Sequence, residues 1–67
     1  DYYYSRGVSY HNQGDYDRDI ADTTKAIQLD PDNPKYYTSR ATTYRAQGKT
    51  ALAEADEAKA RSLGGGR

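Results

Sequence analysis

Tyrosine, small and aliphatic residues recur along the chain at the spacing of one helix face. The inward positions of the first two stretches are Tyr3, Arg6-Gly7 and Tyr10, followed by Tyr16, Ile20, Thr23 and Ile27. Residues three, four and seven positions apart lie on the same side of a helix. The pattern therefore predicts four helices, over Tyr2–Gln13, Asp15 or Tyr16–Leu29, Pro34–Gln47, and Lys49 or Thr50–Ser62.

Glycine and proline interrupt this pattern about every 17 residues, whereas a protein built from strands needs turn signals every 8 to 12. They fall at Gly14, Asp30-Pro31-Asp32-Asn33-Pro34, Gly48 and Gly64-Gly65-Gly66. We expect Gly14 to end the first helix in a left-handed conformation. Asn33 followed by Pro34 is typical of a helix N-cap with proline in the first helical position. An all-α fold is therefore predicted.

The sequence also repeats itself at a displacement of 34 residues. Twelve residues recur unchanged at that distance: Tyr2, Tyr3, Ser5, Arg6, Tyr10, Gln13, Gly14, Ala21, Asp22, Lys25, Ala26 and Leu29. A repeat of this length accommodates two helices and two short turns. The chain is therefore predicted to contain two copies of one helical hairpin.

The period and the segments Gly14-Asp15-Tyr16 and Leu29-Asp30-Pro31-Asp32-Asn33-Pro34 resemble the tetratricopeptide repeat. The resemblance implies two antiparallel helix-turn-helix units, residues 1–33 and 34–63, stacked as a right-handed α-solenoid fragment of four helices, with a flexible tail at 64–67. The chain departs from the family pattern at Arg6, Arg40, Asp19, Thr23 and Glu57. These departures are the positions that most need explanation.

The fourth helix differs from the second along one whole side. The positions equivalent to Tyr16, Ile20, Thr23 and Ile27 are Thr50, Glu54, Glu57 and Arg61. The last unit of a stacked array must show water a polar surface, so we expect the array to end at this helix. The first helix shows no such change, and the chain starts at Asp1 without a Met. We interpret it as a segment of a longer protein that earlier repeats could precede.

Charge and composition narrow the function classes. Ten Lys and Arg balance ten Asp and Glu, which removes the usual electrostatic basis for binding nucleic acid or an anionic membrane surface. No apolar run is long enough for a spanning helix, and the start does not have the layout of a signal peptide. The chain has no Cys, so redox chemistry does not indicate a compartment, and the localisation stays open.

Nothing in the sequence predicts catalysis. His11 is the only histidine, and no nucleophile stands at a suitable spacing from a base. We therefore expect no enzyme, no cofactor and no metal site, and we interpret His11 as a groove or surface residue. The glycine run follows a helix instead of preceding one, so it cannot offer amides to a phosphate.

Two charged pairs recur with the repeat. Arg6 has Asp22 sixteen positions later, and Arg40 has Asp56 at the same spacing. We predict that both are structural ion pairs within their repeats, with the guanidinium planes lying against tyrosine rings. Asp19 stands where the family has a small alanine. Either it reaches a basic residue such as Arg40, which we favour, or the helices are splayed there.

The resemblance implies a concave surface built from the first helix of each repeat. The residues expected on it are Tyr4, Ser5, Val8, His11, Asn12, Lys35, Thr38, Ser39, Thr42 and Arg45. Family members that grip the carboxyl terminus of heat-shock chaperones use a Lys and Asn set on these helices. Here Tyr4 and Val8 replace the first two members of that set, so we expect this clamp to be absent. Tyr4 is either a binding hot spot or an edge aromatic.

The predicted function is a scaffold for protein–protein interaction that binds a peptide or helix of another protein in this groove. Lys35 and Arg45 would favour an acidic or C-terminal peptide. The alternative is a structural module that self-associates within a longer array, because two repeats are fewer than the three or so that such stacks usually need. That alternative implies a homo-oligomer.

Overall fold

The computed structural model describes residues 2–64 and contains four helices in that range. They are α1 (Tyr2–Asn12), α2 (Tyr16–Leu29), α3 (Pro34–Ala46) and α4 (Thr50–Ser62). No strand occurs among the described residues, so the all-α prediction is confirmed, and each helix ends within a residue of the expected position. Most of the expected tail, residues 65–67, lies outside the described part.

Local signals explain where the helices begin and end. The side chain of Asp15 accepts a hydrogen bond from the backbone N–H of Arg18 at the start of α2, at 3.3 Å. Asn33 does the same for Lys35 at the start of α3, at 3.0 Å, with Pro34 in the first helical position. Gly14 has a φ of +79°, a conformation that glycine adopts without steric cost. The Asn33 cap and the Gly14 turn are as the sequence predicted, whereas the Asp15 cap is a feature that the structure adds.

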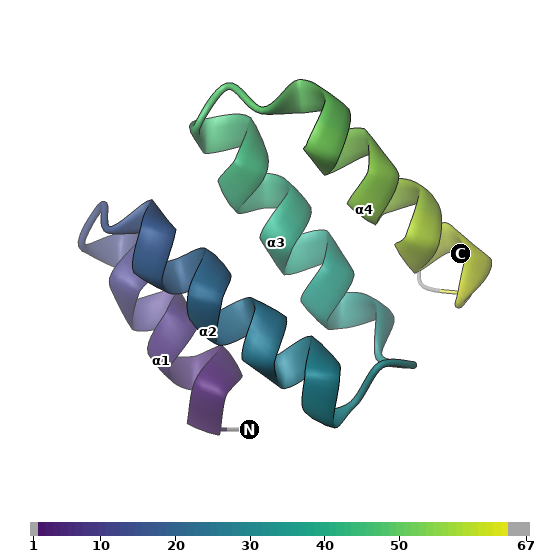
Figure 1. Cartoon of the computed structure of the whole chain (residues 1–67), viewed down its shortest axis with the longest axis horizontal. Helices are drawn as coiled ribbons and strands as arrows, with labels where there is room; N and C mark the ends of the chain where they lie inside the picture. Colours follow the sequence, from purple (N-terminus) through teal and green to yellow (C-terminus); the bar gives the residue numbers. More distant parts are fainter. Residues whose placement is uncertain (1, 65–67) are drawn as a thin grey trace.

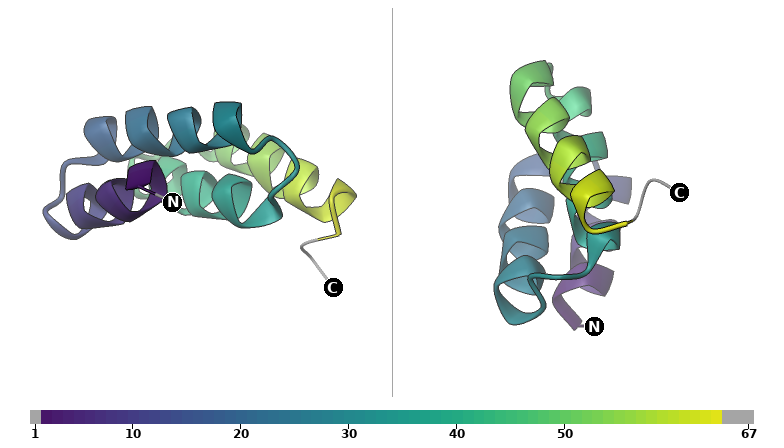
Figure 2. Two further views of the ribbon diagram at one scale, coloured as in Figure 1. Left: turned by 90° about the horizontal axis from the view of Figure 1, so that it is seen from below. Right: turned by 90° about the vertical axis from the view of Figure 1, so that its right-hand side faces the viewer.

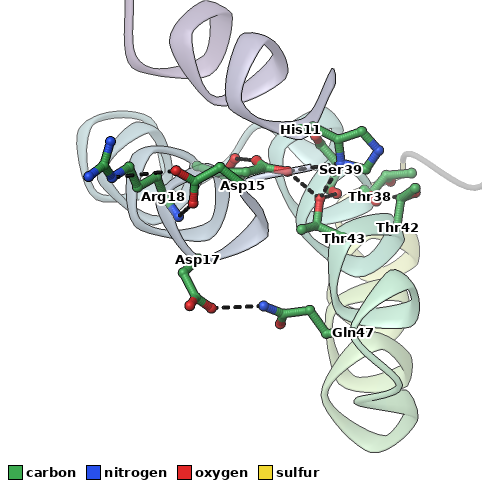
Figure 3. Close-up of polar contacts among 11 residues, drawn as sticks. His11, Asp15, Asp17, Arg18, Thr38, Ser39, Thr42, Thr43 and Gln47 are labelled. Atoms are coloured by element: carbon green, nitrogen blue, oxygen red, sulfur yellow. Dashed lines mark hydrogen bonds and ion pairs between the residues drawn. The ribbon is translucent and has the colours of Figure 1, made fainter. Parts of the chain in front are cut away.

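The helices form two hairpins that stack side by side (Figure 1). α1 packs against α2, α2 against α3, and α3 against α4. α1 and α3 lie on the same side of α2 (Figure 2, left). A hydrogen bond of 3.0 Å from Gln47 Nε2 to Asp17 Oδ1 connects the two hairpins near the start of α2 (Figure 3). The first helices of the two hairpins also meet directly, since His11 Nδ1 of α1 lies 3.1 Å from Thr43 Oγ1 of α3.

Alanine and tyrosine dominate the buried core. Ala26, Ile27 and Tyr36 form its centre, and Tyr3, Tyr4 and Tyr37 pack against it while remaining partly exposed. Tyr37 is the repeat equivalent of the inward Tyr3, but its neighbour Tyr36 is the more deeply buried, with 5% of its surface exposed. Tyr36 belongs to the contact between the two hairpins, which the periodicity of one helix does not reveal.

A close approach of α1 to α2 depends on Gly7. A Cβ at this position would lie 3.1 Å from Thr23 Oγ1 and 3.2 Å from Asp19 Oδ1, tighter than ordinary van der Waals contact. The repeat-equivalent residues in the second hairpin are Ala41 and Ala53, both buried. Gly7 has no side chain, and this leaves room in the first hairpin for the carboxylate of Asp19, where the second hairpin has only the methyl group of Ala53.

The polar side of α4 faces water, which agrees with the sequence prediction. Glu54 and Arg61 are exposed. Glu57 is only partly exposed, because its carboxylate accepts hydrogen bonds from Arg45 of α3, from Nε at 3.0 Å and from Nη2 at 2.7 Å. These bonds hold the pKa of Glu57 below its usual value. The guanidinium of Arg45 is therefore occupied by its ion pair with Glu57 of α4.

The two arginine–aspartate pairs have the same geometry in both hairpins. Arg6 Nε lies 2.7 Å from Asp22 Oδ2, and Nη2 lies 2.8 Å from Oδ1. Arg40 and Asp56 form the same fork at the same two distances. The guanidinium of Arg6 lies 5.0 Å from the centroid of the Tyr2 ring. The structure thus brings together both pairs that the sequence singled out.

The second pair is the more buried of the two. The side chain of Arg40 is 18% exposed, against 43% for Arg6, while both aspartates are 8% exposed. Arg40 also donates a hydrogen bond of 3.1 Å to Thr24 on α2. Its hydrogen bonds to Asp56 raise the pKa of Arg40. Arg40 therefore joins α4 to α2 across α3.

We predict that Arg40→Leu lowers the free energy of unfolding by about 1–3 kcal/mol, since it leaves the buried Asp56 carboxylate without its partner. Chemical denaturation followed by circular dichroism measures this. The double variant Arg40→Leu/Asp56→Leu should regain most of the loss, because a buried ion pair replaced by apolar residues is often neutral. A single variant as stable as the wild type would show that the pair contributes nothing.

Acid should destabilise the fold through Asp22. Its hydrogen bonds from Arg6 lower its pKa in the folded state below the ordinary 3.8. A lowered pKa gives stability that is fully present above the unfolded value and is lost as the pH falls through the folded value. We expect the urea midpoint to fall between pH about 5 and about 2, and to fall less in Asp22→Asn. Asp32→Asn, which alters an exposed carboxylate, is the control. Equal acid dependence in both variants would contradict the assignment.

Candidate functional site

A groove of about 450 Å³ lies between α1 and α3. Seven of the ten residues expected on the concave surface line it: Tyr4, Val8, His11, Lys35, Thr38, Ser39 and Thr42. Pro34 and Asp19 complete the lining. Figure 3 shows His11 of α1 next to the hydroxyl-bearing residues of α3. The structure thus gathers most of the predicted surface into one concave site.

Three expected residues do not line the groove. Ser5 and Asn12 lie exposed on α1 outside it. Arg45 is bonded to Glu57 of α4 and is not among the lining residues, so the structure does not place it in the groove beside Lys35. Helix periodicity places Arg45 on the correct side of α3, but it does not show that a carboxylate on α4 lies within reach.

One end of the groove is aromatic and positively charged. The rings of Tyr4 and Tyr36 lie 5.2 Å apart between their centroids. The ammonium of Lys35 lies 4.8 Å from the centroid of the Tyr4 ring, close enough for a cation–π contact. Val8, which is 39% exposed, and Pro34 add apolar surface. This end offers a cation beside an apolar wall.

The α3 wall is polar, and its hydroxyl groups are already partly used. Thr38 Oγ1 donates to the backbone oxygen of Pro34 at 3.2 Å, and Thr42 Oγ1 donates to that of Thr38 at 3.1 Å. A threonine hydroxyl has one proton and two lone pairs. With the protons committed within the helix, these two oxygens present acceptors to a ligand.

Asp19 lies at the base of the groove, with 2% of its surface exposed. Its Oδ1 accepts a hydrogen bond from Thr23 Oγ1 at 3.0 Å, and its Oδ2 accepts one from Thr43 Oγ1 at 2.5 Å. His11 Nδ1 lies 3.0 Å from the same Oδ2. The favoured sequence prediction, pairing with Arg40, is wrong, because Arg40 is bonded to Asp56 and Thr24. The buried carboxylate is instead satisfied by three short polar contacts.

His11 connects this buried carboxylate to the groove. Its Nδ1 also lies 3.1 Å from Thr43 Oγ1, and its ring centroid is 5.2 Å from that of Tyr16. The side chain is 34% exposed. The sequence placed His11 in the groove but missed Asp19 as a lining residue. The sequence did contain one indication of its role, because Asp19 stands where the family has alanine. A carboxylate at such a buried position requires hydrogen-bond donors nearby.

Neither a metal-binding cluster nor a membrane-spanning helix occurs within residues 2–64. That range holds no cluster of three or more His, Cys, Asp or Glu side chains placed to bind a metal ion. None of its helices combines the length and the apolar character needed to cross a membrane. The groove between α1 and α3 is therefore the candidate site.

Comparison with known protein families gives two matches. One family profile described as tetratricopeptide repeat matches residues 1–33, and a second with the same description matches residues 23–55. A search of curated proteins found no match. Repeats of this kind are generally non-catalytic modules that bind other proteins. With profiles covering residues 1–55 and four helices in two stacked hairpins, the chain belongs to the tetratricopeptide repeat family.

Proposed function

We propose that the groove between α1 and α3 binds an extended peptide segment of another protein. The observation that carries this proposal is the concave surface itself, which joins an apolar wall, a polar wall and one cation. Its volume of about 450 Å³ lies in the range of ligand pockets. That volume holds a few side chains of an extended chain, and is too small for a folded domain.

The charges favour an acidic residue at one end of the peptide. Arg6, Arg40 and Arg45 are each paired with a carboxylate. Lys35 forms none of the salt bridges seen among residues 2–64. An incoming carboxylate near Lys35 therefore gains an ion pair without breaking one.

The apolar wall favours an apolar residue beside that acid. Tyr4 is held by Tyr36 and Lys35, so its ring loses little freedom when a ligand packs on it. Tyrosine in a defined pocket is a common source of binding energy. We therefore assign the Lys35 end of the groove to an acidic residue followed or preceded by an aliphatic one.

The test is a titration of the labelled protein with short acidic–aliphatic peptides, followed by amide shifts in NMR. We expect the largest shifts at Tyr4, Val8, Lys35 and Ser39. Lys35→Glu should weaken binding at least tenfold, because it replaces attraction by repulsion at the same site. Leu52→Glu, which adds the same charge at an exposed position of α4, is the control. Shifts confined to α2 and α4 would contradict the proposal.

Self-association through the outer face of α1 is a second candidate function. It is favoured by a comparison of Tyr2 with Tyr36, its equivalent in the second repeat. Tyr2 is 63% exposed, whereas its repeat equivalent Tyr36 is 5% exposed. In the second hairpin this position is covered by Ala26 and Ile27 of the preceding helix. The corresponding face of the first hairpin leaves an aromatic side chain in contact with water.

Sedimentation equilibrium at increasing protein concentration tests this second function. If the face mediates association, the wild type should form a dimer or larger species, and Tyr2→Ser should remain a monomer, since the exposed ring supplies the apolar contact. Leu29→Ser removes an equally exposed apolar side chain from α2 and should leave association unchanged. A wild type that stays monomeric at millimolar concentration would rule the function out.

A further inference from the structure

The contact between Asp19 and His11 determines which ring nitrogen of His11 carries the proton. Nδ1 lies 3.0 Å from a carboxylate oxygen that also accepts from Thr43. A carboxylate accepts hydrogen bonds and donates none, so the neutral ring holds its proton on Nδ1. The other nitrogen, Nε2, is then an acceptor.

Nε2 lies across the ring from Nδ1 and is therefore directed away from Asp19. The ring is part of the groove lining, as are Thr38 and Thr42 of α3, and Figure 3 shows the three side chains on one side of the site. The hydroxyl protons of both threonines are donated to backbone oxygens, so these two hydroxyl oxygens and Nε2 present acceptors, beside the hydroxyl of Ser39, which can donate or accept. A ligand group that donates a hydrogen bond suits these three acceptors.

We propose that His11 is a pH-dependent selector of ligand side chains at this end of the groove. With a neutral ring, the site prefers a donor such as an amide. Once Nε2 is protonated it becomes a donor with positive charge, and the site prefers a carboxylate. This inference rests on the proposed peptide-binding function and adds to it a preference that reverses with pH.

The groups around His11 support this assignment. Asp19 and the ring of Tyr16 face it from α2, and Thr43 faces it from α3. Lys35 is the cation of the same groove, seven positions before Thr42 on α3. The buried Asp19 carboxylate compensates an imidazolium charge, so protonation leaves no unpaired cation. Histidine is the side chain whose charge ordinarily changes between pH 5 and 8.

The spacing of the two ends gives the ligand a register. Seven helical positions correspond to about 10 Å at 1.5 Å per residue. Thr42 lines the groove together with His11, and an extended peptide covers about 3.3 Å per residue. The ligand residue at His11 therefore lies three positions along the peptide from the ligand residue at Lys35. The ligand class is therefore an extended peptide with an acid at one end and, three residues away, an amide or hydroxyl at neutral pH or a second acid at lower pH.

Two capped tetrapeptides test this inference, Glu-Leu-Ala-Asn and Glu-Leu-Ala-Asp, which differ only in the last side chain. Their affinities are measured by NMR titration at pH about 7.5 and about 5.5, where peptide carboxylates remain ionised. We expect the ratio of the affinity for the Asp peptide to that for the Asn peptide to rise about three- to tenfold at the lower pH, the effect of about one ordinary hydrogen bond in a site open to water. Using the ratio cancels pH effects common to both peptides.

His11→Gln is the matched variant, since its side-chain amide reaches into the groove but does not titrate. The ratio should then be independent of pH. A wild-type ratio that does not change, or the same change in His11→Gln, contradicts the inference and leaves the groove proposal standing. The ring nitrogens of the free protein give a readout without ligand: Nδ1 should carry the proton at neutral pH, and a proton on Nε2 would overturn the assignment. If neither peptide shifts the groove amides at either pH, the proposed function fails, and this inference fails with it.

Discussion

The arrangement of the first three helices depends on one buried carboxylate. Asp19 on α2 receives hydrogen bonds from Thr23 of its own helix and from Thr43 of α3, and it contacts His11 of α1. A buried charge of this kind is costly unless its lone pairs are satisfied. The cost of leaving it unpaired therefore disfavours any arrangement that separates these helices. Gly7 makes the site possible, because a side chain there would meet both Asp19 and Thr23.

The repeat explains what stabilises each hairpin, and the differences between repeats explain the groove. The arginine–aspartate forks and buried alanines occur in both hairpins. Asp19, His11, Tyr4 and Lys35 have no counterpart, since their repeat equivalents are other residue types. These unrepeated residues gather at the groove between α1 and α3. Several of the residues that distinguish the two copies therefore line the groove that we propose as the binding site.

The sequence was sufficient for the helices and for the interactions that recur. Turn glycines and the Asn33-Pro34 cap mark the helix boundaries locally, and the shared spacing of Arg6 with Asp22 and of Arg40 with Asp56 identified both forks. Contacts between the two hairpins could not be predicted in this way, because periodicity tells on which side of its helix a residue lies but not how far it is from residues of another helix. For that reason only the structure shows three features: the hydrogen-bond partners of Asp19, the pairing of Arg45 with Glu57, and the burial of Tyr36.

The role of Asp19 as the connection between hairpins is tested most directly by native-state hydrogen exchange of Asp19→Ala beside the wild type. In the wild type, amides of α1 and α3 should open with similar free energies, because one carboxylate connects both helices to α2. In the variant, protection should fall most in α1 and at the α3 residues around Thr43, while α4, which is held by the Arg40–Asp56 fork, should lose least. Equal loss of protection in all four helices, or no loss in any of them, would contradict this account.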